Sequence, residues 1–193
     1  LLIGSTNRTK GQNTNILITG EKNQVESELN NVSIIGGKMG KALTNGQVLI
    51  GGGSFTSEIG LMQMSFIQLS LKTTNADVSY LTTQGDSTNY ITLQNNVIIG
   101  YEAHIVALCT GGSSGTAGQY IYYKLIGAVK VVNDYTATFT QSISTIADGS
   151  LSISTTPVMA DSTDGYTSIK VVGTANVNIT WSASVHLYEN RTD

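Results

Sequence analysis

The sequence predicts an all-β fold, in which a short β-roll or solenoid-like repeat segment is followed by an antiparallel β-sandwich. Residues 178–188 alternate without a break between apolar and polar side chains, which indicates a strand with one dry and one wet face. Nearer the N-terminus, an apolar pair closely followed by glycine recurs several times. Charged residues make up only 12 % of the chain, about half the roughly 25 % that is usual, so Ser, Thr, Asn, Gln and Gly must cover much of the surface.

The repeat occupies residues 1–57, which we predict to be one domain, a β-roll-like stem. Counted from the second apolar residue, its copies lie at Ile3, Ile18, Ile35 and Ile50, with spacings of 15, 17 and 15 residues. Units this short cannot bury their own apolar side chains, so we expect them to stack on one another. The stack would still have a thin core. Three copies of the chain around a three-fold axis would complete it, and we therefore predict a homotrimer.

A helix is the competing interpretation of Asn23–Leu43, because several apolar residues there fall near helical spacing. Glycines at positions 36, 37 and 40 and the Asn30–Asn31 pair disfavour a long helix. A single helical turn around Gln24–Leu29 stays open.

From Glu58 onward the pattern changes to strands separated by turn-rich segments, so we predict a second domain, an antiparallel β-sandwich, over residues 58–193. The connections are rich in Gly, Ser, Asn and Asp, as in Gln84–Asn89 and Thr110–Gly118, and Pro157 stands in another of them. The candidate strands are Met64–Leu71, Val78–Thr82, Tyr90–Leu93, Asn96–Cys109, Gln119–Val132, Thr136–Ile146, Ser150–Thr155, Ser168–Val172 and Val177–Tyr188.

Two residues mark the expected core of the sandwich. Trp181 is the only tryptophan and lies in the middle of the apolar row of residues 178–188. Cys109 is the only cysteine and ends an apolar run, so we expect a buried, inert thiol and no disulfide within the chain.

Charge and hydropathy exclude several partners. The net charge of −3 provides no basic field, which argues against nucleic acid or an anionic membrane as the main partner. The chain has no long uncharged apolar run, so we expect no insertion into a membrane. Because the sequence starts with Leu1 in the middle of a pattern, we expect it to be part of a longer chain.

The residues give little sign of catalysis or of a cofactor. Neither Gly51–Ser54 nor Gly111–Thr116 carries the Lys-Ser/Thr of a phosphate-binding loop. His104 and His186 lie in predicted strands without neighbouring ligands, so we predict no metal, although a three-fold axis could gather three copies of one histidine. Glycosidase chemistry needs a pair of carboxylates, for which the candidates are Glu21, Glu26 and Glu28 in the repeat and Asp161 and Asp164 in a turn. We predict no enzyme.

Tyrosines offer the clearest candidate binding surface. Tyr120 and Tyr122 share one strand face with Lys124, and a tyrosine presents a flat apolar face with a polar tip. We therefore predict that these three residues contact a receptor. Tyrosines on a sheet surface without any ligand are the alternative.

The motifs resemble those of phage fibres. The repeat form Asn31–Gly36 is similar to the β-roll repeats of trimeric phage fibres and trimeric adhesin heads. Residues 96–190 resemble the C-terminal β-sandwich of phage tail-fibre and head-fibre proteins. The matching order is a strand like Tyr101–Leu108, a Gly/Ser loop, a strand like Tyr120–Gly127, a turn-rich segment like Ala160–Gly165 and an ending like Ile169–Val185.

The resemblance implies a structural protein of the bacteriophage virion, a homotrimer that presents a C-terminal host-attachment domain. Its partners would be a host cell-surface receptor, often a glycan, and other virion proteins. The His-x-His signature of some metal-threaded fibre tips is absent, so no axial iron is implied. Two alternatives remain: a bacterial trimeric adhesin head, and a fragment of a polysaccharide-degrading tailspike in which Glu26 or Glu28 would be required.

Overall fold

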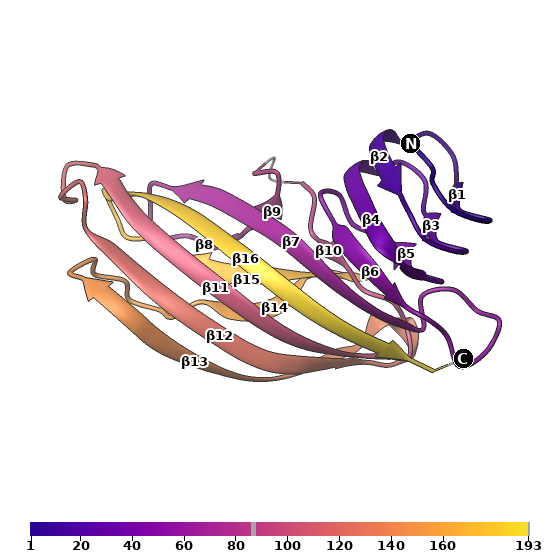
Figure 1. Cartoon of the computed structure of the whole chain (residues 1–193). Helices are drawn as coiled ribbons and strands as arrows, with labels where there is room; N and C mark the ends of the chain where they lie inside the picture. The colour runs from indigo at the N-terminus through magenta and orange to yellow at the C-terminus, as the bar shows by residue number, and fades with distance from the viewer. Residues whose placement is uncertain (86–87, 193) are drawn as a thin grey trace.

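A computed structural model describes residues 1–85 and 88–192, and over these residues the chain is all-β, as predicted. Figure 1 shows a small coil of strands at the N-terminal end and a longer two-sheet sandwich that extends from it. Asp86 and Ser87, in the predicted connection Gln84–Asn89, lie outside the described residues, as does Asp193 at the end of the predicted second domain. Within the described part, no helix is long and apolar enough to cross a membrane.

The N-terminal coil has three stacked turns, and each turn contributes one strand to each of two parallel sheets. Its apolar interior is made by Ile18, Val25, Leu29, Val32, Ile34, Ala42 and Leu49. One sheet contains β1 (Arg8–Thr9), β3 (Gln24–Val25) and β5 (Lys41–Ala42). The other contains β2 (Thr14–Ile18), β4 (Asn30–Lys38) and β6 (Val48–Gly52). The solenoid-like segment is thus confirmed, and Asn23–Leu43 forms strands and turns rather than a helix.

The register of the coil differs from the predicted one by one residue in some turns. Leu2 pairs with Ile18, Ile18 with Ile34, and Ile34 with Leu49, so the spacings are 16, 16 and 15 residues. Ile34 is fully buried, whereas Ile35, on which the count was based, is 49 % exposed. Adjacent residues of a strand point to opposite faces, so a pair of apolar residues does not show by itself which of the two faces inward.

Stacked side-chain amides support a corner of the coil. Asn23 donates from Nδ2 to the carbonyl oxygen of Thr19 at 2.8 Å, and its Oδ1 accepts from the amide of Gly40 at 2.7 Å. One turn earlier, Asn7 donates from Nδ2 to the carbonyl of Gly20 at 2.9 Å, and its Oδ1 accepts from the amide of Asn23 at 2.9 Å. These bonds satisfy backbone groups that a sharp corner would otherwise leave unpaired.

Gly20 occupies the same corner because a side chain has no room there. Its φ is +95°, and an added Cβ would lie 2.3 Å from the carbonyl oxygen of Gly37 in the next turn. Turns can therefore stack at backbone contact distance only where glycine stands, which explains the recurring glycine of the repeat.

The sandwich consists of one large and one small sheet. The large sheet has the order β13-β12-β11-β16-β7 and continues through β6 into β4 and β2, while β9 (Thr82–Thr83) pairs with one end of β7. Its long antiparallel strands are β7 (Met62–Thr73), β11 (Val97–Gly111), β12 (Tyr120–Val131), β13 (Ala137–Gly149) and β16 (Asn178–Arg191). A short 3-10 turn, η1 (Asn133–Tyr135), joins β12 to β13.

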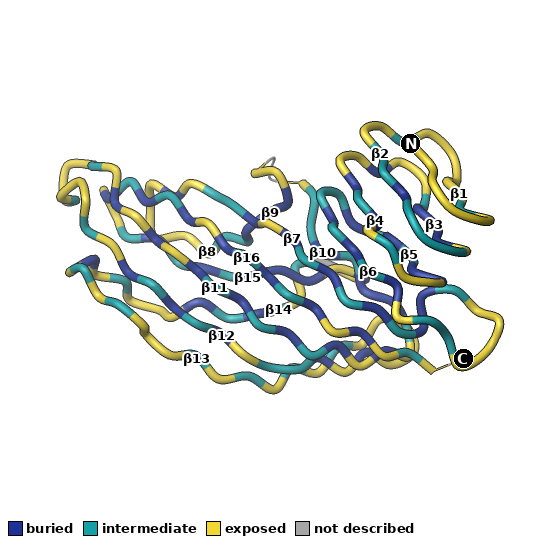
Figure 2. Tube along the Cα trace, in the orientation of Figure 1, coloured by how far each residue is buried: buried dark blue, intermediate teal, exposed yellow. Residues whose placement is uncertain are grey.

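The small sheet covers one face of the large one (Figure 1). It contains β8 (Val78–Tyr80), β10 (Ile91–Thr92), β14 (Val158–Thr163) and β15 (Tyr166–Val172), all paired directly or indirectly through β15. Figure 2 shows the alternation of buried and exposed residues along the long strands. One face of the large sheet is therefore buried against the small sheet. The other face, which we call the open face, is not covered by the small sheet.

The predicted dry face of β16 is confirmed. Ile179, Trp181, Ala183, Val185 and Leu187 are all buried in the main core. The indole Nε1 of Trp181 donates to Oγ1 of Thr73 on the adjacent β7 at 2.9 Å, so its one polar group is satisfied. Cys109 is buried in the same core, as expected.

Three of the predicted strands and connections were wrong. The predicted strand Val78–Thr82 is divided between β8 of the small sheet and β9 of the large sheet. Ser150–Thr155 forms no strand, although Leu151 is buried against the core and Ser150 makes an isolated bridge to Tyr120. Conversely, the segment from Ala160, predicted to be turn-rich, belongs largely to β14, and only Asp164–Gly165 turns. Pairing with β15 accounts for β14, because a Ser/Thr/Asp-rich run becomes a strand where a neighbouring edge accepts it.

The coil and the sandwich share a sheet. β6 pairs antiparallel with β7, from Val48 opposite Phe66 to Gly51 opposite Gln63. The predicted boundary between residues 57 and 58 falls in the connection between these two strands, and the division into two domains there stays a prediction. The shared sheet implies that the coil is attached rigidly to the sandwich.

Candidate functional site

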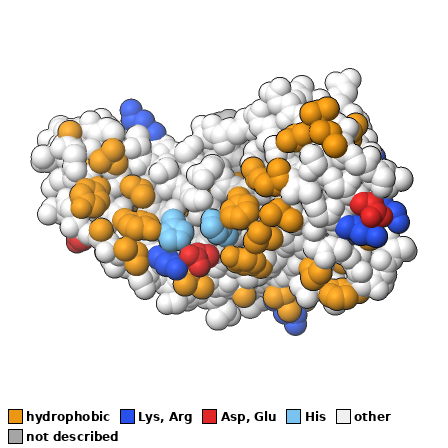
Figure 3. All heavy atoms as spheres, in the orientation of Figure 1, with side chains coloured by type: hydrophobic (Ala, Val, Ile, Leu, Met, Phe, Trp, Pro, Cys, Tyr) orange, Lys and Arg blue, Asp and Glu red, His pale blue; other side chains and the backbone are white. Residues whose placement is uncertain are grey.

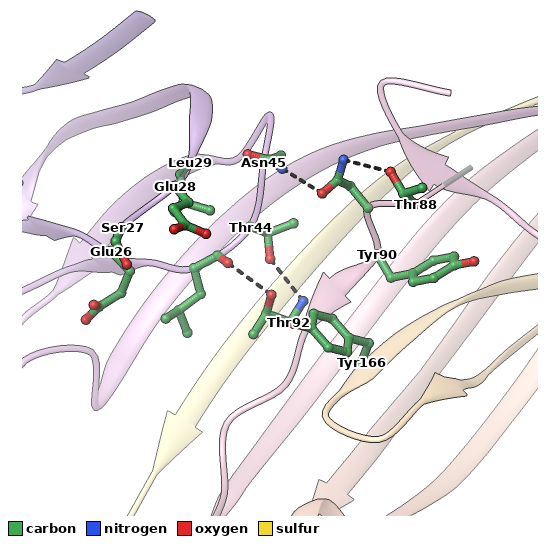
Figure 4. A pocket seen from close by; sticks show the side chains of 12 residues that line it. Glu26, Ser27, Glu28, Leu29, Thr44, Asn45, Thr88, Tyr90, Thr92 and Tyr166 are labelled. Atoms are coloured by element: carbon green, nitrogen blue, oxygen red, sulfur yellow. Dashed lines mark hydrogen bonds between the residues drawn. The ribbon is translucent and has the colours of Figure 1, made fainter. Parts of the chain in front are cut away.

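A pocket of about 500 Å³ lies where the coil meets the small sheet of the sandwich (Figure 4). The coil contributes the turn between β3 and β4 and the segment after β5, and the sandwich contributes the approach to β10 and the first residue of β15. Its lining residues are Glu26, Ser27, Glu28, Leu29, Leu43, Thr44, Asn45, Thr88, Asn89, Tyr90, Thr92 and Tyr166.

Hydrogen bonds across the junction fix the floor of the pocket. The amide of Thr92 donates to Oγ1 of Thr44 at 3.1 Å, and the Thr92 hydroxyl donates to the carbonyl oxygen of Leu43 at 3.0 Å. Nδ2 of Asn45 donates to Oδ1 of Asn89 at 2.9 Å. The two walls are therefore held at a defined separation, as a preformed binding site requires.

Two carboxylates line the coil side. Glu26 contacts Nζ of Lys10 at 3.1 Å and Nζ of Lys41 at 3.5 Å. Partial burial raises the pKa of Glu26, but the hydrogen bond from Lys10 and the charges of Lys41 and Lys10 outweigh that effect, so the net pKa is lowered. Glu26 is therefore an anion at neutral pH. Glu28 lies in the short connection between β3 and β4, where it is exposed and has a φ of +63°.

Tyrosines line the sandwich side. Tyr166 is 41 % exposed, and Tyr90 packs edge-on against Tyr80 with ring centroids 6.4 Å apart. The pocket thus combines flat apolar rings, amides, hydroxyls and carboxylates. Such a set can stack on a ring-shaped ligand and hydrogen-bond its polar edge, as a sugar would require.

The same geometry is less suited to hydrolysis. A glycosidase needs one carboxyl that stays protonated at its working pH, which requires a raised pKa. In Glu26 the pKa is lowered, because two lysines stabilise the anion. Glu26 is therefore poorly suited to donate a proton to a leaving group.

The predicted receptor residues lie elsewhere, on the open face of the large sheet. Strand register brings Tyr122 and Lys124 together with Glu102 and His104 of β11. Oε1 of Glu102 is 2.9 Å from Nζ of Lys124 and 2.9 Å from Nε2 of His104, while Nδ1 of His104 bonds the Tyr122 hydroxyl. The hydrogen bond from Lys124, followed by that from His104, lowers the pKa of Glu102.

Tyr120 lies further along the same face. It is 43 % exposed, and its ring covers Gly149, where an added Cβ would lie 2.3 Å from a ring carbon. The polar ends of Tyr122 and Lys124 are already bonded within the sheet, whereas Tyr120 is open. Receptor binding by Tyr120, Tyr122 and Lys124 stays a prediction.

The other candidate residues are placed as follows. His186 packs edge-on against Phe66 at 4.5 Å, and its ring centroid is 6.5 Å from that of His104. Among the described residues, no three His, Cys, Asp or Glu side chains lie close enough to hold a metal ion. Burial, and then the charge of Asp164, raises the pKa of Asp161 in β14.

Sequence patterns identified Glu26 and Glu28 as candidate carboxylates but gave no sign of the pocket around them. Its opposite wall, with Tyr90, Thr92 and Tyr166, comes from segments that are far from the turn in sequence. The only local signal was the presence of tyrosines beside Asn- and Thr-rich turns.

No protein-family model matches this chain, and no curated protein matches it in sequence. Matches to solved structures include three tailspike proteins of Acinetobacter phages. The Acinetobacter baumannii phage AM24 tailspike is 10 % identical, with a TM-score of 0.41 over 89 % of this chain and 34 % of that one. The Acinetobacter phage vB_ApiP_P1 tailspike is 9 % identical, with a TM-score of 0.30 over 91 % of this chain and 39 % of that one.

The third is gp49 of Acinetobacter baumannii bacteriophage Fri1, a capsular polysaccharide depolymerase. It is 10 % identical, with a TM-score of 0.33 over 91 % of this chain and 36 % of that one. This chain therefore spans little more than a third of the length of these tailspikes. TM-scores below 0.5 do not establish a shared fold, so we take the function from the chain's own sequence and geometry.

Proposed function

We propose that this chain is a structural part of a bacteriophage virion fibre, a homotrimer that attaches to the host by binding a surface glycan. The fibre-like repeat and the strand order of residues 96–190 support the first part of the proposal. The coil joined to a β-sandwich by a shared sheet fits a rigid, elongated unit. Other virion proteins would be its partners within the particle.

The pocket at the junction is the observation that best supports a glycan as the ligand. A sugar ring has apolar faces and a rim of hydroxyls, and the pocket presents tyrosine rings opposite carboxylates and amides. Oε1 of Glu26 is already bonded to Lys10 and Lys41, so the exposed Glu28 is the carboxylate that can accept from hydroxyls of the ligand. The hydrogen bonds between Thr92 and residues 43–44 keep the site preformed, which limits the entropy lost on binding.

Binding of purified bacterial surface polysaccharides tests this function. Two tyrosines of nearly equal exposure offer a matched pair: Tyr166 in the pocket and Tyr120 on the open face. We expect Tyr166→Ala to weaken binding by about tenfold, roughly 1.4 kcal/mol, and Tyr120→Ala to leave it unchanged. The reverse result would move the receptor site to Tyr120, Tyr122 and Lys124, and no binding by the unmodified protein to any polysaccharide of its host would refute the proposal.

Glycan cleavage is the second candidate, because two of the carboxylates considered for it, Glu26 and Glu28, line the pocket. We propose that the chain binds without cleaving. The assay is release of reducing ends from host polysaccharide by the unmodified protein and by Glu26→Gln and Glu28→Gln. Release that both substitutions abolish would establish a depolymerase instead.

A further inference from the structure

The face of the large sheet that the small sheet leaves open is unusually apolar. Large apolar side chains that are 40–55 % exposed line its three central strands: Ile98, Val106 and Leu108 on β11, Tyr120 and Ile126 on β12, and Tyr188 on β16. Figure 3 shows apolar side chains on one face of the molecule, on both sides of a small group of basic, acidic and histidine side chains. The open face continues on β7 and β6.

Strand register places the apolar residues of the open face on both sides of Glu102, His104 and Lys124. Tyr188 lies opposite Met64, which lies opposite Ile50 in the coil. Tyr120 lies opposite Leu108 at the far end. An apolar band therefore crosses from the coil into the sandwich.

The band is hollowed in two places. One hollow, of about 450 Å³, is lined by Ile98, Val132 and neighbouring residues, and another, of about 330 Å³, by Ile50, Met62, Met64 and Tyr188. Hollows of this kind accept protruding side chains of a partner protein better than a smooth surface does.

The size of the open face fits a protein interface. A half-exposed large side chain presents roughly 70–100 Å², so the six residues present roughly 420–600 Å², and the partly buried Met62, Met64 and Phe66 of β7 add a smaller area. The largest apolar patch on a typical monomer is about 300–600 Å². A stable interface buries about 800 Å² on each partner.

The charges of the open face fit a copy of itself. Glu102 at its centre is paired with Lys124 and His104 of the same chain, so this group is already balanced and needs no opposite charge from a partner. The remaining charged residues, Lys72 and Lys130, lie at opposite ends, opposite Thr180 and Ile98. When two copies meet through such a face, the central charges are already balanced within each chain, and Lys72 and Lys130 stay at the rim.

We propose that the open face packs against a second copy of this chain. This inference rests on the proposed homotrimer and identifies the surface that would hold it together. A receptor glycan, as predicted for Tyr120, Tyr122 and Lys124, is the competing occupant.

The test is the molar mass in solution of a double variant, Leu108→Lys with Ile126→Lys, measured by light scattering. Val78→Lys is the control, because Val78 is 59 % exposed but lies on the small sheet. We expect the unmodified protein and the control at three times 20.4 kDa and the folded double variant at 20.4 kDa. An unchanged mass in the double variant, or a loss of assembly in the control too, would overturn the proposal.

Two further outcomes separate this inference from the proposed function. An unmodified protein of 20.4 kDa that still binds glycan would refute the homotrimer and this interface but keep the pocket. A double variant that assembles normally yet loses binding to host cells would assign the open face to the receptor.

Tyrosine footprinting of the unmodified protein tests the interface should the double variant fail to fold. Tyr188 lies in the open face, and Tyr166 lies in the pocket. We expect chemical labelling of Tyr188 to rise at least fivefold on dilution to the monomer, while labelling of Tyr166 stays constant. Equal labelling of Tyr188 at all concentrations would contradict the interface.

Discussion

The coil and the sandwich are both built from strands, yet they are held together differently. The coil has seven buried apolar residues in its core and relies on parallel backbone ladders and stacked amides such as Asn7 and Asn23. The sandwich buries a far larger cluster centred on Trp181. Removal of one apolar side chain should therefore lower the free energy of unfolding most in the sandwich. Removal of one buried hydrogen-bonding side chain should lower it most in the coil.

The largest effect is expected from Trp181→Ala. The substitution leaves a cavity in the main core and removes the donor that bonds the Thr73 hydroxyl. The free energy of unfolding should therefore fall by about 3–5 kcal/mol. Urea unfolding measures it, with Trp181→Phe as the milder control. A loss below about 1 kcal/mol would show that Trp181 is not the centre of the core.

The next largest effect concerns the junction between the two regions, where Glu189 is buried beside Gln63 and Ser65. Burial raises the pKa of Glu189 to about 7, although hydrogen bonds from Gln63 and Ser65 partly oppose the shift. An unfolded glutamate ionises near its ordinary pKa of 4.5. The folded state therefore binds the proton more tightly, and stability should fall as the pH rises from 4.5 to 7.

Glu189→Gln should remove that dependence. Above pH 7 the variant should be more stable than the unmodified protein by up to about 3 kcal/mol, and near pH 4 the two should be similar. Thermal unfolding between pH 4 and pH 8 measures the difference. Parallel stability curves for the two proteins would show that Glu189 is not protonated in the fold.

In the coil, Asn23→Ala should cost about 2 kcal/mol. It removes partners from the buried amide of Gly40 and the carbonyl of Thr19. Thr14→Ala, which removes an exposed bond to Asn30, should cost less than about 1 kcal/mol. Hydrogen exchange of residues 14–42 measures the stability loss of each variant. Equal losses would mean that the stacked amides stabilise the coil no more than an exposed hydrogen bond does.

The smallest effect tests the register of the coil. Ile34→Val should cost about 1 kcal/mol because the side chain is buried, whereas Ile35→Val should cost almost nothing. Denaturant unfolding of the pair measures this difference. A greater loss for Ile35→Val would restore the spacing predicted from the sequence.

The comparison also shows how much the sequence could predict. Strict alternation identified β16 and its buried face, because a period of two is visible within one segment. The repeat identified the coil, but the adjacent pair Ile34–Ile35 could not reveal which residue faces inward. β14 was missed because its strand character depends on pairing with β15 rather than on its own residues.

The candidate site was harder to predict than the fold. Glu26 and Glu28 could be suspected as carboxylates, but no local pattern places Tyr90 and Tyr166 opposite them. Tyr122 and Lys124 were correctly placed on one strand face, yet their bonds to His104 and Glu102 depend on the register between β11 and β12. Contacts between distant segments cannot be obtained from a single sequence pattern.

The most direct test of the central claim is hydrogen exchange of the protein with and without a bound oligosaccharide from its host's surface polysaccharide. We predict protection of the pocket segments, residues 26–29, 43–45 and 88–92, with no change on β12. Protection confined to residues 120–124 would contradict the pocket and assign attachment to the open face.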